Sequence, residues 1–154
     1  MKELHFVSTS GEPAAQKLGR RGEELAADFL LKKNYRLVAA NFIVPIGRNR
    51  RGALVNAEID LIAYDRATLC FVEVKTRSSD EFAAPEAAVN LRKQRQITRA
   101  AQAYRRIFHL PDAVFRFDVI SVVLNDPAEK LQIEHFQNFW SENKFRKFRL
   151  QEHN

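Results

Sequence analysis

Two neighbouring apolar segments of the chain carry charged residues at strand-like spacing. The segment AEIDLIA contains Glu58 and Asp60, and the segment FVEVKTR contains Glu73 and Lys75. A charge is costly to place among isoleucine, leucine, valine and phenylalanine unless it is paired, binds a metal or takes part in chemistry. All three options are open for these residues, and their spacing decides which of them can be combined.

A hairpin formed by the two segments would bring the acidic residues together. Side chains alternate along a strand, so Glu58 and Asp60 share one face, and Glu73 and Lys75 share a face of the partner strand. With a turn centred in residues 65–68, Asp60 faces Glu73 and Glu58 faces Lys75, with Cβ atoms about 4.5–5.5 Å apart. This register is an assumption, because a loop of odd length would shift it by one residue and separate the carboxylates.

Opposed carboxylates repel each other unless a proton or a cation lies between them. One acid could be protonated, as in a carboxylate dyad. Alternatively, Mg²⁺ or Mn²⁺ could bind Asp60 and Glu73, with the backbone carbonyl of Val74 as a further oxygen ligand. Lys75 would then orient or deprotonate a water, or stabilise the charge on a pentavalent phosphate. These are the parts of metal-assisted phosphodiester hydrolysis. The other reading is a set of ordinary ion pairs, Glu58–Lys75 among them.

The elements that would position these residues form a mixed pattern. We expect one domain over residues 13–140, after a flexible start at 1–12 and before a basic tail at 141–154. Its elements are a helix within 12–35, a strand within 35–44, the two charged strands, a helix over 91–110 capped by Asn90, and strands within 114–124 and 130–140. This order predicts an α/β layer architecture.

The segment PIGRNRRGAL, residues 45–54, has no hydrophobic period and two glycines, which is typical of a mobile loop. Its three arginines, Arg48, Arg50 and Arg51, either grip phosphates or are simply solvated.

Composition limits the class of protein. The net charge of +6 favours a polyanionic partner. The single cysteine, Cys70, excludes an internal disulfide and a cysteine-rich zinc site, and its apolar neighbours predict a buried, inert thiol. No segment is apolar and long enough to cross a bilayer and no signal peptide opens the chain, so we expect a cytoplasmic location and no membrane partner.

The second predicted helix has two faces. Ile97, Tyr104 and Phe108 belong to the face expected to point inward, which Lys93 and Gln94 extend. Four arginines lie within a sector of about 60° on the opposite side: Arg92, Arg95, Arg99 and Arg106. They predict either a phosphate-contacting surface or an ordinary solvated face. The tail combines basic residues with Phe145 and Phe148, which predicts either nucleic-acid binding or a short helix packed on the core.

Several separated motifs resemble the YraN-like family between Lys17 and Trp140. The family comprises small bacterial proteins assigned to the PD-(D/E)XK nuclease superfamily and similar to archaeal Holliday-junction resolvases. The matching motifs are Gly19-x-x-Gly22-Glu23, Glu58-Ile59-Asp60-Leu61-Ile62-Ala63, Phe71-Val72-Glu73-Val74-Lys75-Thr76-Arg77, Ala88-Val89 with Lys93, and Arg116-Phe117-Asp118-Val119.

This resemblance implies a restriction-endonuclease-like fold, with a central mixed β-sheet flanked by α-helices. It also implies roles: Asp60 and Glu73 match the metal-binding acids, Lys75 the catalytic lysine and Glu23 the acid from the first helix. A polar residue from the helix after the Glu-x-Lys strand would be Lys93 or Gln94. The chain departs from the family in two places: Ala57 stands where a glycine is usual, and residues 45–56 are longer than expected.

The leading hypothesis is therefore a Mg²⁺- or Mn²⁺-dependent endonuclease acting on DNA, including branched or repair intermediates. Its expected nucleic-acid contacts are Arg77, Arg92, Lys93, Arg95 and Arg99. The second hypothesis is a nucleic-acid-binding module that keeps the fold without turnover, and the third is a structural domain whose acids are merely paired. Junction-cleaving relatives act as dimers, so the resemblance also implies a homodimer.

Overall fold

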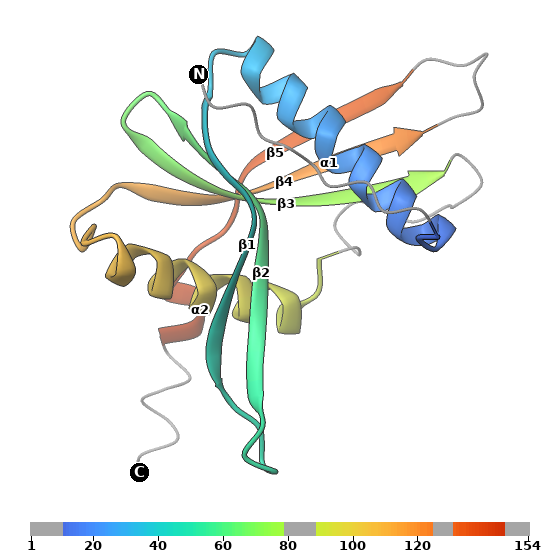
Figure 1. Ribbon diagram of the computed structural model, residues 1–154. Helices are drawn as coiled ribbons and strands as arrows, with labels where there is room; N and C mark the ends of the chain where they lie inside the picture. Colours follow the sequence, from blue (N-terminus) through green and yellow to red (C-terminus); the bar gives the residue numbers. More distant parts are fainter. Residues whose placement is uncertain (1–10, 79–88, 125–130, 147–154) are drawn as a thin grey trace.

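The structure is a computed structural model that describes residues 11–78, 89–124 and 131–146. Its helices and strands follow the predicted order (Figure 1). They are α1 (Ala14–Lys32), β1 (Arg36–Arg48), β2 (Leu54–Asp65), β3 (Thr68–Ser78), α2 (Leu91–Ile107), β4 (Phe115–Leu124) and β5 (Gln132–Trp140). Residues 79–88 and 125–130 lie outside the described residues, as do the first ten residues and the last eight, which include Phe148 of the basic tail.

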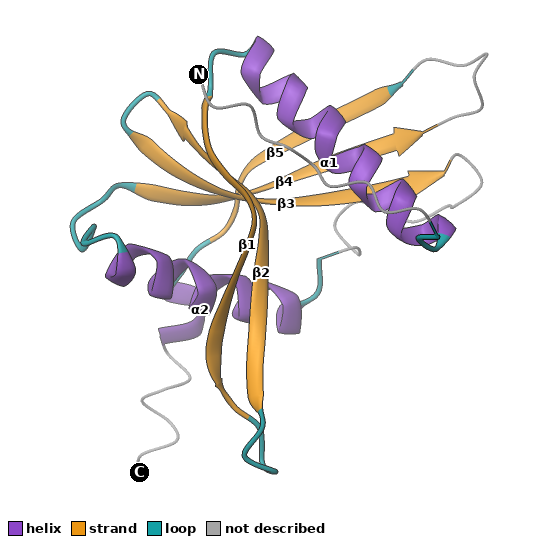
Figure 2. Ribbon diagram, in the orientation of Figure 1, coloured by secondary structure: helices purple, strands orange, loops and turns teal. Residues whose placement is uncertain are grey.

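The five strands form one mixed sheet in the order β1-β2-β3-β4-β5. Only β3 and β4 are parallel; the other neighbours are antiparallel. A parallel pair needs a long crossover, and α2 provides it. The helices cover opposite faces of the sheet (Figure 2). The predicted fold class is thus confirmed: an α/β fold with a central mixed sheet and flanking helices, consistent with the restriction-endonuclease-like fold.

Each face of the sheet has its own hydrophobic core. On the α1 side, Ala26 and Leu30 pack against residues such as Leu61, Val72 and Ile120. Cys70 is fully buried on this side, and burial raises the pKa of its thiol to about 11, as expected for an inert cysteine.

The α2-side core is rich in aromatic rings. Trp140 stacks on Phe117 at 4.7 Å, and its indole N–H donates to Thr98 Oγ1 at 2.9 Å. Phe145, in the short helical stretch at residues 143–146, also packs against this core. Phe108 was expected to point inward, but it lies just past the end of α2 and is 51% exposed.

The sheet divides where β2 leaves β3 (Figure 2). The β2–β3 ladder ends at the pair Leu61–Val72, whereas β2 continues beside β1 back to Leu54. The regular alternation expected for residues 58–63 was wrong, because it breaks at Asp60: Ile59 is buried on the α2 side and Leu61 on the α1 side. Asp60 therefore lies at the branch point, which we call the fork.

The expected loop at residues 45–54 is shorter in the structure. β1 extends to Arg48 and β2 begins at Leu54, so the paired hairpin takes up half of this segment and its turn is confined to residues 49–53. Pro45 fits here because β1 is an edge strand. The sequence of this segment lacks the alternation of apolar and polar residues that predicts a strand. Its arginine side chains can stay exposed because cross-strand backbone hydrogen bonds hold the two strands together.

Close packing of α1 against β3 depends on a missing side chain. A Cβ added to Gly22 would overlap Thr76 Oγ1 and lie 2.8 Å from Thr76 Cβ. Rotating the threonine cannot relieve the second contact, because its Cβ is fixed to the backbone. Gly22 thus allows the close approach that brings the next residue, Glu23, towards the fork.

We predict that Gly22→Ala lowers the free energy of unfolding by about 2 kcal/mol, because α1 must move away from β3. The matched control is Gly19→Ala in the same helix, where an added Cβ meets no atom within 4 Å. That variant should gain roughly 0.5–1 kcal/mol from improved helix propensity. Urea unfolding of both variants measures the difference, and equal stability of the two would contradict this account of the packing.

Candidate active site

The structure confirms the predicted hairpin register. Asp65 pairs with Thr68 and Leu61 with Val72, so Asp60 and Glu73 are the next positions beyond the end of the ladder. The Val74 N–H donates to Asp60 Oδ2 at 2.7 Å. This hydrogen bond replaces a strand-to-strand backbone bond at the fork and fixes the Asp60 carboxylate beside β3.

Glu73 is the most deeply buried acid of this region, with 3% exposure. Its Oε1 lies 3.3 Å from Lys75 Nζ and 3.9 Å from Lys93 Nζ. Its Oε2 is buried and has no hydrogen-bond partner. The Glu58–Lys75 ion pair of the alternative reading is not formed between these two described residues, and the Lys75 ammonium group contacts Glu73 instead. Oε1 of the Glu73 carboxylate therefore lies near two ammonium groups, whereas Oε2 has no hydrogen-bond partner.

A second acidic pair approaches the fork from the α1 side. The Asn41 side-chain amide donates to Glu23 Oε2 at 2.9 Å and to Glu58 Oε1 at 2.7 Å. Burial raises the pKa of Glu23, and the nearby charges of Glu58 and Glu73 add to this effect, although the hydrogen bond from Asn41 opposes it. Asn41 thus holds two carboxylates that would otherwise repel each other.

Neither Asn41 nor a site role for Glu58 was predicted from the sequence. Asn41 has a left-handed φ of 52°, a conformation that asparagine adopts more readily than most residues. An asparagine within the apolar stretch of β1 is the one signal that the sequence offers.

Asp60 is the acid most perturbed by its surroundings. It is partly exposed, but burial of its carboxyl group raises its pKa well above the ordinary value. The charge of Glu73 raises this pKa further, against the lowering effect of the Val74 hydrogen bond. The fork therefore favours a bound proton or cation near Asp60.

The donor set at the fork fits a hard divalent cation. Asp60 and Glu73 supply carboxylate oxygens, and Glu73 Oε2 is a buried acceptor without a partner. Among the described residues, no group of three or more His, Cys, Asp or Glu side chains converges as a complete metal site. This pattern suits Mg²⁺, which binds through one or two carboxylates and completes its shell with waters or substrate phosphate.

Of the expected nucleic-acid contacts, only Lys93 reaches the carboxylates. Gln94, the other candidate for the polar helix position, is buried and donates to the Val89 carbonyl at 2.9 Å. Arg77 is partly buried near the end of β3. The basic face of α2, defined as Arg92, Arg95, Arg99 and Arg106, is exposed. We use the term fork site for Glu23, Asn41, Glu58, Asp60, Glu73, Lys75 and Lys93.

Two other polar clusters lie apart from the fork site. Asp118 is fully buried and accepts hydrogen bonds from Arg116 and from the Asn138 N–H, with His135 Nε2 at 2.9 Å, so its contacts are structural. Although burial raises the pKa of Asp118, these hydrogen bonds outweigh it and lower the pKa.

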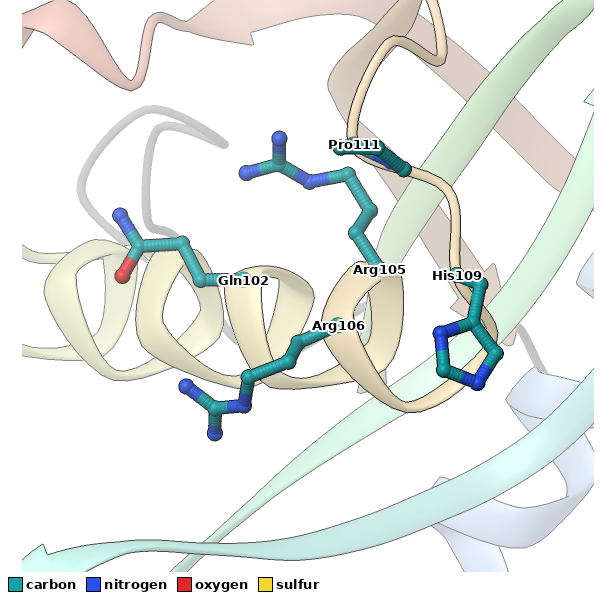
Figure 3. A pocket seen from close by; sticks show the side chains of 5 residues that line it. All are labelled: Gln102, Arg105, Arg106, His109 and Pro111. Atoms are coloured by element: carbon teal, nitrogen blue, oxygen red, sulfur yellow. The ribbon is translucent and has the colours of Figure 1, made fainter.

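The other cluster is a pocket at the C-terminal end of α2 (Figure 3). It has a volume of about 610 Å³ and is lined by Gln102, Arg105, Arg106, His109 and Pro111. Arg105 is held by Glu142 at 2.8 Å. Since Lys93 lies at the other end of α2, roughly 18 Å from Arg105 along the helix axis, this pocket does not belong to the fork site.

Comparison with known proteins identifies the family. A family model described as "Uncharacterised protein family UPF0102" matches residues 22–122. The chain belongs to this family. The matched residues include all members of the fork site, and the membership agrees with the YraN-like resemblance of the motifs.

Family members from several bacteria are similar over most of their length. A UPF0102 protein of Chlorobium phaeobacteroides is 43% identical over 79% of this chain and 91% of its own length. A UPF0102 protein of Chlorobium limicola is 42% identical over 81% of this chain and 93% of its own length. A solved structure titled "Crystal structure of SSO0001" is similar over 92% of this chain but only 62% of that chain, less than two thirds of its length. At 15% identity and a TM-score of 0.37, that likeness supports no statement about function. No described helix of this family member is long and apolar enough to span a membrane.

We predict that Asp60→Asn stabilises the metal-free fold at neutral pH. Because the pKa of Asp60 is raised in the folded state, the native fold loses stability as pH rises above the ordinary aspartate value of about 4. The asparagine variant cannot ionise, and its amide oxygen can still accept from the Val74 N–H. Urea unfolding in the presence of chelator should show that the free energy of unfolding of the variant, relative to that of the native chain, increases between pH 4 and pH 8.

Asp118→Asn is the control of opposite sign. The pKa of Asp118 is lowered in the folded state, so its ionisation stabilises the fold above the ordinary aspartate pKa, and the stability is lost as pH falls. This variant should be less stable than the native chain at pH 8, with a smaller deficit near pH 4. If Asp60→Asn were less stable than the native chain at pH 8, this would contradict the inference that the ionised Asp60 carboxylate destabilises the metal-free fold.

Proposed function

We propose that the protein is a metal-dependent endonuclease that hydrolyses DNA phosphodiester bonds. One observation carries the proposal: Glu73 Oε2 is a buried acceptor without a partner, next to Asp60 and to a lysine that already contacts the same carboxylate. Buried side-chain acceptors normally have a hydrogen-bond partner, so this oxygen calls for an explanation such as an ion that binds there. A site that must receive a cation and a phosphate leaves such an oxygen available.

The cation ligands that we propose are residues of the fork site and the backbone next to them. Asp60 and Glu73 would bind Mg²⁺ or Mn²⁺ through their carboxylates, and the Val74 carbonyl is the further oxygen that we proposed from the sequence. The bound metal would act as a Lewis acid on the phosphate and lower the pKa of a water. The Val74 N–H keeps the Asp60 carboxylate in place.

The surrounding side chains supply the remaining parts. Lys75 is 30% exposed, so its ammonium group can contact both Glu73 and a phosphate that enters from solvent. Its positive charge would stabilise the negative charge that develops on phosphorus oxygens. Glu23, with its raised pKa and its hydrogen bond to Asn41, is placed to accept a proton at the edge of the fork site.

A nucleic acid is the proposed substrate because of the surface charge, and the choice of DNA rests on the resemblance to DNA-cleaving nucleases. The net charge is +6, and the exposed basic face of α2 lies on the helix that also carries Lys93 into the fork site. Such a surface would bind the phosphate backbone of either strand without reading sequence. Activity on branched or repair intermediates is a narrower proposal that rests on the resemblance to junction-cleaving nucleases.

A second function, nucleic-acid binding without turnover, is favoured by one observation. Lys75 and Lys93 both approach Glu73 Oε1, so the described residues already neutralise much of its charge without a metal. The basic face of α2 would then bind DNA independently of the carboxylates. Under this function, Asp60→Asn leaves the affinity for DNA and its salt dependence unchanged.

We predict that the native protein cleaves linear, flapped or four-way-junction DNA in Mn²⁺, and that Asp60→Asn and Lys75→Ala each lower the rate at least about 100-fold. A matched control is Asp65→Asn, which changes an acid of the same strand that pairs with Arg116 at 3.0 Å, away from the fork. It should retain the native rate. Circular dichroism checks that each variant is folded, and gel-based cleavage assays measure the rates.

Each outcome separates the two functions. Binding to DNA by the native chain with no cleavage of any of these substrates would favour the non-catalytic module. Cleavage that persists at the native rate in Asp60→Asn would exclude the fork site as the catalytic centre.

A further inference from the structure

The paired hairpin formed by the ends of β1 and β2 projects away from the rest of the sheet (Figure 1). Its outer part, residues 45–56, contains three arginines and no acidic residue. The described residues place this ribbon beyond the fork, on the same two strands that carry Asn41 and Asp60. A positively charged projection on the strands that carry the proposed phosphodiester site needs an explanation, because most of its residues are exposed and, among residues 45–56, Ile46 alone packs against the core.

The tip of this hairpin is an ordered structure. Asn49 Oδ1 accepts hydrogen bonds from the N–H groups of Arg51 and Ala53, both at 3.0 Å. Arg48 Nη1 donates to the Gly52 carbonyl at 2.7 Å across the turn. These bonds fix the turn backbone and leave the side chains of Arg50 and Arg51 exposed. The tip therefore presents two cationic side chains on a turn whose backbone is already ordered, so less conformational entropy is lost when a partner binds.

The base of the outer hairpin is fixed to α2. The pairing of β1 with β2 is irregular between Pro45 and Gly47, where a bulge bends the ribbon. Arg99, from the basic face of α2, donates to the Ile46 carbonyl at this bulge. Gly47 has a φ of 150°, and a Cβ there would lie 2.9 Å from Arg99 Nη2. The bulge and Arg99 thus set the direction of the hairpin relative to α2.

We propose that the tip of this hairpin enters the major groove of B-form duplex DNA, with Arg50 and Arg51 contacting the DNA. The inference rests on the proposed function and narrows its substrate to DNA that is double-stranded roughly 20 Å from the cleaved bond, because six strand residues separate Asp60 from Leu54 at the base of the turn. The major groove is about 12 Å wide and admits a two-stranded ribbon without deformation, whereas the minor groove of about 6 Å must first be widened or the DNA bent. The major groove of duplex RNA is too deep and narrow for side chains to read.

Binding measurements in Ca²⁺, without added Mg²⁺ or Mn²⁺ and under conditions that show no cleavage, test this proposal. Arg50→Ala/Arg51→Ala should bind duplex DNA at least about tenfold more weakly, and the slope of log affinity against log salt should fall by about 2. Its affinity for single-stranded DNA and for duplex RNA should change less than about twofold. The charge-matched control is Lys32→Ala/Arg66→Ala, two exposed residues outside the outer hairpin, Arg66 in the turn at the opposite end of β2.

A second variant tests the anchoring without changing any charge. Gly47→Ala should displace Arg99 from the Ile46 carbonyl and weaken duplex binding severalfold, while circular dichroism shows an intact fold. A methylation-interference experiment on the major-groove N7 atoms of guanine locates the contact: modification should block the native chain and leave Arg50→Ala/Arg51→Ala unaffected.

The outcomes distinguish this inference from the function on which it rests. If the native chain binds no DNA, the proposed function fails and the inference with it. If the native chain binds duplex DNA and the arginine variant matches the control, only the hairpin inference is overturned. An equal loss on single-stranded and duplex DNA would mean that the arginines contact phosphates without entering a groove, which also overturns it.

Discussion

The hydrogen bond from the Val74 N–H to Asp60 Oδ2 is the interaction on which the site depends. In a continuous ladder, a backbone carbonyl of β2 would accept from this N–H, and no charge would be needed. Where β2 turns away, the Asp60 carboxylate takes that place, so a backbone donor is satisfied and an acid is fixed beside Glu73. The division of the sheet thus places the carboxylates of Asp60 and Glu73 together at the end of the β2–β3 ladder.

Elements on both faces of the sheet contribute to the fork site. From the α1 side, Gly22 permits close packing on β3, so that Glu23 can meet Asn41 near the branch point. From the α2 side, Lys93 follows the helix cap, where Asn90 Oδ1 accepts from its N–H at 2.9 Å, and reaches Glu73. The core clusters on each face hold these helices, so the charges at the fork are positioned by apolar packing some distance away.

Much of this arrangement follows from sequence because it depends on local signals. The Asp65–Thr68 pairing was predictable from the short segment between two apolar strands, even though the turn places Arg66, a non-glycine residue, at a φ of 56°. The Asn90 cap and the buried Asp118 were also predictable, since a helix start and an acid in an apolar strand each have few structural solutions. The resemblance added Glu23, which no spacing argument connects to residues so distant along the chain.

The remaining features could not be predicted because they arise from long-range geometry. Asn41 bridges Glu23 and Glu58 only after α1 and β2 meet it in three dimensions. The break of alternation at Asp60 comes from strand divergence, which a two-residue period cannot express. The outer hairpin was mistaken for a loop because its arginines and glycines resemble loop composition, while its cross-strand pairing and the Arg99 anchor depend on the partner elements.

The most direct test of the central claim is the anomalous scattering of Mn²⁺ in crystals grown with a non-cleavable DNA duplex. The account predicts a peak at the fork, with carboxylate oxygens of Asp60 and Glu73 at metal-ligand distances of about 2.0–2.3 Å, and no peak there in Asp60→Asn. Bound duplex without a peak at the fork of the native chain, or a peak only at another site, would contradict it.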